Sequence, residues 1–183
     1  YVAQHPPNSI LPHEIAHDLL NRFLIPSSSE RQYGTDAPDW LDEAVAVMFE
    51  FDEDKEVRRC EAKALHNAKK LIPLNRFLTM AHPDLASIFE SGTVARDFVF
   101  KTSMAEETPA FYAMTLAFSE FLDSGEEQVS LSMVIGSFLL GESLPEWILS
   151  RRGQGSSLYD FDFLQSEFDA WLDHNEAYDC GKD

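Results

Sequence analysis

The chain has 183 residues, of which 44% are hydrophobic and 12% aromatic, a composition typical of a folded globular protein and not of a disordered one. It carries 14 Lys and Arg against 32 Asp and Glu, and its formal charge of −18 repels nucleic-acid phosphates and anionic lipid headgroups. We therefore expect no nucleic-acid partner. No apolar run reaches the roughly 18 residues that a membrane span needs, so we expect a single domain over residues 1–183 with one sizeable core.

Apolar residues follow the helical period of 3.6 along nearly the whole chain, which predicts a mainly α fold. In chain order, the predicted helices span about residues 9–24, 38–51, 52–70, 73–80, 85–89, 109–122, 126–139, 144–150 and 160–174. The first ends before Pro26, and Pro38 and Pro109 stand at helix starts, where proline is favoured. Residues 93–101 fit a strand or a helix. Residues 52–70 are strongly charged, so we expect this helix to be largely exposed and structural.

Two histidines stand four residues apart in the first predicted helix, in the segment His13-Glu14-Ile15-Ala16-His17. A helix places such a pair on one face, within reach of a single ion, and HExxH is a zinc-binding pattern whose Glu serves as general base. The competing interpretation is a surface pair of histidines on an amphipathic helix. On a helical wheel the two histidines lie beside Glu14, at the boundary of one apolar arc formed by Ile15, Ala16, Leu19, Leu20, Phe23 and Leu24.

A catalytic zinc site needs three protein ligands and one open position for water, so a third ligand must come from elsewhere in the chain. Glu43 in the second predicted helix is the candidate, because packing of that helix on the first would bring its carboxylate near both imidazoles. Glu43 could equally belong to an acidic surface stripe with Asp39, Asp42 and Glu50. Periodicity alone does not decide between these two interpretations.

The two segments together resemble the gluzincin zinc metallopeptidases, and among them the peptidase MA-like group. In that family HExxH is followed by a helix with the pattern P-x-W-L-x-E-G/A-x-A, which is matched here by Pro38, Trp40, Leu41, Glu43, Ala44 and Ala46. The resemblance implies a zincin-like helical core and one zinc ion per chain, held by His13, His17 and Glu43. It also implies hydrolysis of a peptide or protein substrate with Glu14 as catalytic base. A bacterial cell envelope or secreted location is implied as well, although no signal is visible.

A second resemblance concerns residues 110–118, which look like the family helix that runs Y-A-x-S-x-x-L. The family Tyr stabilises the oxyanion, a task that needs a phenolic donor directed at the developing charge. This implies Tyr112 as a second catalytic residue. Tyr112 fits a core position beside Phe111, Phe118 and Phe121 equally well.

The chain departs from the family pattern ahead of the HExxH helix. At this position zincins have a twisted sheet whose edge strand binds the substrate backbone. Only 12 residues precede His13, too few for that sheet. We therefore expect either a fragment or a reduced version, with the metal site in residues 1–105 and a helical C-terminal part in 106–183. The alternatives are a catalytically weak or inactive zincin-like binding or scaffold domain, and a purely structural helical protein in which the motif is a coincidence.

The remaining ionisable candidates receive no special role. We expect ordinary surface or helix-end positions for four histidines, His5, His66, His82 and His174. Asp18 points away from the predicted ligands on the helical wheel. Cys60 and Cys180 do not form a metal-binding pair by spacing, and two cysteines fit one disulfide or two thiols.

Overall fold

The computed structural model describes residues 10–27, 35–83, 107–125, 128–154, 156 and 158–180. These residues are mainly helical and contain no strand, which confirms the prediction of a mainly α protein. None of the described helices is both long and apolar enough to cross a membrane. The segments 85–89 and 93–101, for which a helix and an undecided element are predicted, lie outside the described residues.

The described helices follow the predicted order with shifted ends. They are α1 (Ile10–Phe23), α2 (Asp39–Met48), α3 (Asp52–Asn67), α4 (Leu74–Phe77), α6 (Thr108–Leu122), α7 (Leu131–Leu139), α8 (Leu144–Arg152), α9 (Phe161–His174) and the 3₁₀ helix η1 (Glu176–Tyr178). Helix α7 begins later than predicted, because Ser130 just before it has an extended backbone. An extended backbone at Phe51 likewise separates α2 from α3.

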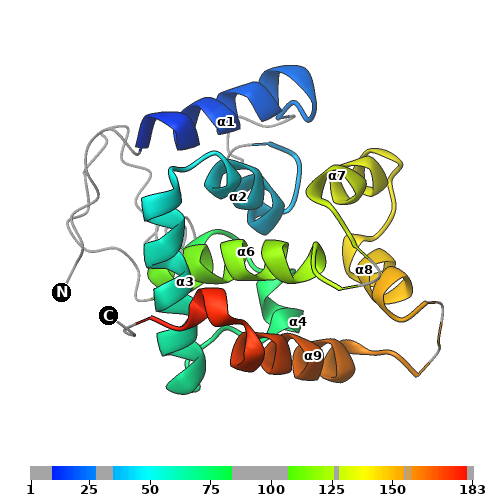
Figure 1. The fold of residues 1–183 in the computed structure, drawn as a ribbon. Helices are drawn as coiled ribbons and strands as arrows, with labels where there is room; N and C mark the ends of the chain where they lie inside the picture. Colours follow the sequence, from blue (N-terminus) through cyan, green and yellow to red (C-terminus); the bar gives the residue numbers. More distant parts are fainter. Residues whose placement is uncertain are drawn as a thin grey trace, which may run out of the picture.

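Helix α6 runs through the middle of the molecule, with α2 and then α1 on one side of it and α9 on the other (Figure 1). It contacts α2, α3 and α9 directly. Its sequence is apolar on nearly every side, and a helix of this kind is stable only when other elements surround it. The described helices α2 and α3 therefore pack against the later helix α9 through α6.

An aromatic cluster around Phe118 of α6 holds the neighbouring helices together. The Phe118 ring centroid lies 5.8 Å from that of Trp40, 5.9 Å from Phe77 and 5.9 Å from Phe168, mostly edge to face. All four side chains are fully buried. Through Trp40 this cluster anchors α2, the helix that carries Glu43.

The structure divides the predicted apolar arc of α1. Ala16 and Leu20 are buried on the face that packs against α2, and this face also carries the two histidines of HExxH. The apolar side chains on the opposite face are exposed, and the exposed fraction reaches 75% for Phe23. These exposed side chains are Leu11, Ile15, Leu19, Phe23 and Leu24. The histidines therefore lie on the packed face of α1 rather than at the edge of a buried arc.

Most residues of α3 are at least partly buried rather than exposed, and one stripe formed by Asp54, Arg58 and Ala62 is buried. The helix packs against α6. The expectation of a purely structural, largely exposed helix therefore missed Arg58, whose guanidinium forms a buried ion pair with Glu50. The sequence does not distinguish Arg58 from the solvated charged residues around it, because its partner Glu50 lies outside α3.

Cys60 in α3 and Cys180, just after η1, form a disulfide, which decides between the two alternatives that the sequence leaves open. The bond ties the C-terminal segment to α3, and η1 packs against the same helix. Tyr178 of η1 is buried and donates a hydrogen bond of 2.7 Å to Glu120 of α6.

The disulfide joins residues 120 positions apart, so it restricts a long loop of the unfolded chain and should stabilise the fold by roughly 2–4 kcal/mol. We expect a Cys60→Ala/Cys180→Ala variant to lose about this much free energy of unfolding in urea denaturation followed by circular dichroism. A reducing agent should lower the stability of the wild type and leave the variant unchanged. Equal stability of the two proteins under oxidising conditions would contradict the role given to this bond.

Candidate metal site

Three side chains from α1 and α2 converge on one point: His13, His17 and Glu43. The Nε2 atoms of the two histidines are 3.1 Å apart. Oxygens of Glu43 lie 3.3 Å from His13 Nε2 and 3.5 Å from His17 Nε2. One donor atom from each residue lies within 4.8 Å of the others, so the group could hold a metal ion. The structure thus brings together the three ligands predicted from the sequence.

The burial of the acidic residues in and after α2 decides between the two interpretations of Glu43, a metal ligand or part of a surface stripe. Asp42 and Glu43 are fully buried and Glu50 is 7% exposed, so these carboxylates do not form a surface stripe. They are buried because α1 packs on α2 along the face that carries them. Glu43 faces α1 while Trp40, one turn earlier, faces the core.

The Nδ1 atom of each imidazole, on the far side of the ring from Glu43, contacts a buried carboxylate. His13 Nδ1 lies 2.9 Å from Glu50 Oε1, and His17 Nδ1 lies 3.4 Å from Asp42 Oδ1. An ionised carboxylate can only accept, so each Nδ1 carries a proton and donates it. In a neutral imidazole, Nε2 then presents its lone pair, and both lone pairs point at the space beside Glu43. Histidines that bind metals are commonly oriented by a carboxylate in this way.

The two orienting carboxylates are themselves fixed. Arg58 donates to both oxygens of Glu50, from Nε at 2.6 Å and from Nη2 at 2.5 Å, a bidentate geometry that is both strong and directional. Asp42 Oδ2 accepts a hydrogen bond of 2.8 Å from the backbone N–H of Thr35. Asp42 of α2, Arg58 of α3 and two residues of connecting segments, Thr35 and Glu50, therefore orient the two imidazoles of α1.

The charges of this cluster shift its pKa values. Burial by itself lowers the pKa of His17, but the hydrogen bonds to Asp42 and Glu43 outweigh it and raise that pKa to about 10. For His13 burial acts in the same direction, and the bonds to Glu43 and Glu50 again raise the pKa. Burial opposes ionisation of Glu50, yet its bonds with His13 and Arg58 lower its pKa. In the metal-free cluster the protonated imidazoles of His13 and His17 therefore supply positive charge beside Glu43.

The structure gives different environments to the two predicted catalytic residues, Glu14 and Tyr112. Glu14 follows His13 on α1 and is exposed. Tyr112 on α6 is only partly buried, and its ring centroid is 5.9 Å from that of His13. By contrast, Phe111 and Phe118 of the same helix are fully buried. Tyr112 thus lies at the margin of the aromatic core, beside His13 and with its ring centroid 6.4 Å from that of Phe111, and its catalytic role stays a prediction.

His82 is a residue of this site that sequence analysis missed. The expectation of a surface or helix-end position is wrong, because the side chain is 2% exposed. Its Nε2 lies 3.3 Å from the Tyr112 hydroxyl oxygen and 3.8 Å from Glu43 Oε1. His82 stands in an irregular segment after α4, where no helical period could indicate its direction.

The other residues that received no role behave largely as expected. His66, near the end of α3, is partly buried and lies 2.8 Å from Asp173. His174 is the exposed last residue of α9. Asp18 is exposed and accepts a 2.7 Å hydrogen bond from Arg22 on the same helix. His5 lies outside the described residues.

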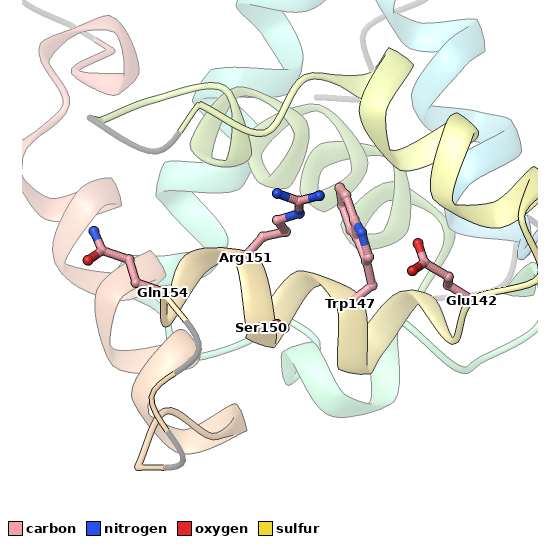
Figure 2. A pocket seen from close by; sticks show the side chains of 5 residues that line it. All are labelled: Glu142, Trp147, Ser150, Arg151 and Gln154. Carbon is pink, nitrogen blue, oxygen red and sulfur yellow. The ribbon is translucent and has the colours of Figure 1, made fainter.

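A surface cavity of about 430 Å³ lies elsewhere, along α8. Figure 2 shows the side chains that line it, with Trp147 and Arg151 projecting from the same side of the helix. The Arg151 guanidinium lies 5.4 Å from the centre of the Trp147 ring. The remaining lining residues are Glu142, Ser150 and Gln154. The cavity shares no residue with the metal-binding group and is separate from it.

Comparison of the chain with models of known protein families, with curated proteins and with solved structures found no match to any of them. No relative therefore supplies an activity or a ligand.

Loss of an orienting carboxylate should weaken metal binding, because the imidazole that it holds gains rotational freedom and loses basicity. We expect Glu50→Gln and Asp42→Asn each to lower zinc affinity by about 10- to 100-fold, measured by competition with a chromogenic chelator. Asp18→Asn is the matched control, since Asp18 is an exposed carboxylate on the same helix as the histidines, and it should bind zinc like the wild type. Unchanged affinity in both buried variants would contradict the orienting role.

Proposed function

We propose that this protein is a gluzincin-type zinc metallopeptidase that hydrolyses peptide bonds in a peptide or protein substrate. One observation carries the proposal: His13, His17 and Glu43 converge, with a buried carboxylate behind each imidazole. The HExxH spacing on α1 and the Trp-Leu-x-Glu pattern on α2 support it from the sequence.

The donor set suits zinc. Two imidazole nitrogens and one carboxylate form a ligand set of hydrolytic zinc sites, and three protein ligands leave one position open. Ligand atoms at about 2.0–2.1 Å from a tetrahedral ion stand about 3.3 Å from one another. The two nitrogens here are 3.1 Å apart, His13 Nε2 lies 3.3 Å from Glu43 Oε2, and His17 Nε2 lies 3.5 Å from Glu43 Oε1. One donor atom from each of the three residues lies within 4.8 Å of the others. Iron(II) can use the same ligand types, so the test measures which metal is bound.

Each residue of the site has a defined task in this proposal. Bound zinc would act as a Lewis acid that polarises the scissile carbonyl and lowers the pKa of a water molecule. Glu14 takes a proton from the attacking water and returns it to the leaving amine, a transfer that its exposed position beside the ligands permits. The Tyr112 hydroxyl donates a hydrogen bond to the developing oxyanion.

The second candidate function is a zincin-like binding or scaffold domain with weak or no catalysis. It is favoured by one feature, since the described residues contain no strand and the gluzincins use an edge strand to bind the substrate backbone. Such a domain would bind the metal through the same three ligands. Peptides that stay intact after long incubation with fully metal-loaded protein would support it over the peptidase.

The disulfide between Cys60 and Cys180 supports the cell-envelope or secreted location that the family resemblance implies. Disulfides persist mainly in oxidising compartments such as the periplasm and the extracellular space. A peptidase with this bond would work in such a compartment.

Metal content gives the first test. We expect about one zinc ion per chain by elemental mass spectrometry after equilibration with limiting zinc, and much less in a Glu43→Ala variant, because two imidazoles alone bind zinc weakly. The same measurement reports iron and other metals. No bound metal in the wild type would refute the proposed site and favour a purely structural protein.

Catalysis gives the second test. A Glu14→Gln variant should keep its zinc and lose at least about 100-fold of its peptide hydrolysis, because the amide cannot accept the proton of the attacking water. Asp18→Asn, one helical turn further along α1, should retain activity. Hydrolysis of a set of quenched-fluorescence peptides measures both. Equal rates in the wild type and Glu14→Gln would show that Glu14 is not the base.

A further inference from the structure

His82 is buried and anchored between two helices that form the site. Its backbone N–H donates a hydrogen bond of 2.6 Å to Asp39 Oδ2, at the start of α2. Its ring meets that of Phe111 on α6 edge to face, with centroids 5.3 Å apart. An imidazole has two polar nitrogens, which are costly to bury without hydrogen-bond partners. The groups that Nε2 faces therefore indicate which hydrogen bond this side chain makes.

That nitrogen faces two residues of the proposed site at once. Nε2 of His82 lies 3.3 Å from the hydroxyl oxygen of Tyr112 and 3.8 Å from Glu43 Oε1. The Tyr112 ring is held separately, because the Arg58 guanidinium lies 4.7 Å from its centre. Arg58 thus fixes where the ring lies, and His82 contacts the hydroxyl that would act on the substrate.

The hydrogen bond between His82 and Tyr112 can run in either direction. If Tyr112 donates to Nε2, the phenolic proton points at His82 and is not available to form a hydrogen bond with the substrate. If Nε2–H donates to the Tyr112 oxygen, the phenolic proton does not point at His82 and can be donated to another acceptor. The carboxylate of Glu43 favours the second arrangement, because it attracts a proton-bearing nitrogen and repels a lone pair.

We propose that His82 is a positioning residue, whose Nε2–H donates to Tyr112 and so directs the phenolic proton toward the oxyanion of the substrate. The inference rests on the proposed peptidase function. His82 acts through Tyr112 and has no contact of its own with the reacting atoms in this role.

Two variants of similar size test the role of the donor. In His82→Gln the side-chain amide can place an N–H near the position of Nε2, whereas His82→Met has no donor there. We expect His82→Met to lower kcat by about 10- to 100-fold, with KM and zinc content nearly unchanged, because misdirecting one oxyanion donor weakens transition-state binding. His82→Gln should stay within about threefold of the wild type. The substrate is the quenched-fluorescence peptide that the wild type cleaves fastest.

A double variant separates this role from a general effect on the fold. Tyr112→Phe should lower kcat on its own, and adding His82→Met to it should cause little further loss, because both changes remove the same hydrogen bond to the oxyanion. Fully additive losses would overturn the inference, since they would mean that His82 acts independently of Tyr112.

Nuclear magnetic resonance supplies a readout that does not depend on activity. The imidazole ¹⁵N shifts of His82 show which nitrogen carries a proton, and we expect it on Nε2. The ¹³Cζ signal of Tyr112 should move in His82→Met and stay near the wild-type position in His82→Gln. A proton on Nδ1 alone would overturn the inference even if His82→Met failed to fold.

The outcomes distinguish the inference from the function on which it rests. A wild type that binds zinc and cleaves peptide, together with a folded His82→Met variant of equal kcat, would overturn the role of His82 and leave the proposed function standing. A wild type that binds no metal or cleaves no peptide would overturn the proposed function, and the role of His82 with it.

Discussion

The site depends on buried negative charge between α1 and α2. Asp42, Glu43 and Glu50 are all buried, and a buried carboxylate is costly unless a cation or several donors compensate it. Arg58 supplies one positive charge through its bidentate contact with Glu50. The two imidazoles supply the rest, either protonated or, in the proposed holoprotein, with a metal ion held between them and Glu43. The cluster therefore needs positive charge beside Glu43, which protonated imidazoles can supply and which, in the proposed holoprotein, a metal ion would supply.

The same charges connect α1 to the body of the protein. Among the apolar side chains of α1 from Leu11 to Phe23, Ala16 and Leu20 are buried and most of the others are exposed. The pairs His13 with Glu50 and His17 with Asp42 thus add polar attachment where apolar contact is limited. A metal ion coordinated from both α1 and α2 would strengthen this attachment, because metal affinity for a folded site adds to folding stability.

The aromatic core fixes the helices that carry the donor residues. Trp40 fixes α2 against Phe118 of α6, and α6 also carries Tyr112. Arg58 projects from α3, which packs on α6 and is tied to the C-terminal segment by the disulfide. Residues on rigid, mutually packed helices keep their geometry better than residues on loops. Only Glu50, Thr35 and His82 of the described site come from connecting segments, and each is held by a hydrogen bond.

Helical periodicity determined the fold class, the order of the described helices and the placement of both HExxH histidines on one face, because these are local properties with a period of 3.6 residues. The three candidate metal ligands could be named from the sequence, since His13 and His17 are neighbours on one helix and Glu43 stands in a pattern that resembles the gluzincins. The tertiary structure alone decided that Glu43 is buried and not part of a surface stripe, and that α1 exposes most of its apolar arc. It also brought in Glu50, Arg58 and His82. Those side chains meet partners 37, 8 and 30 positions away, and no local spacing rule links residues whose contact arises only when helices pack.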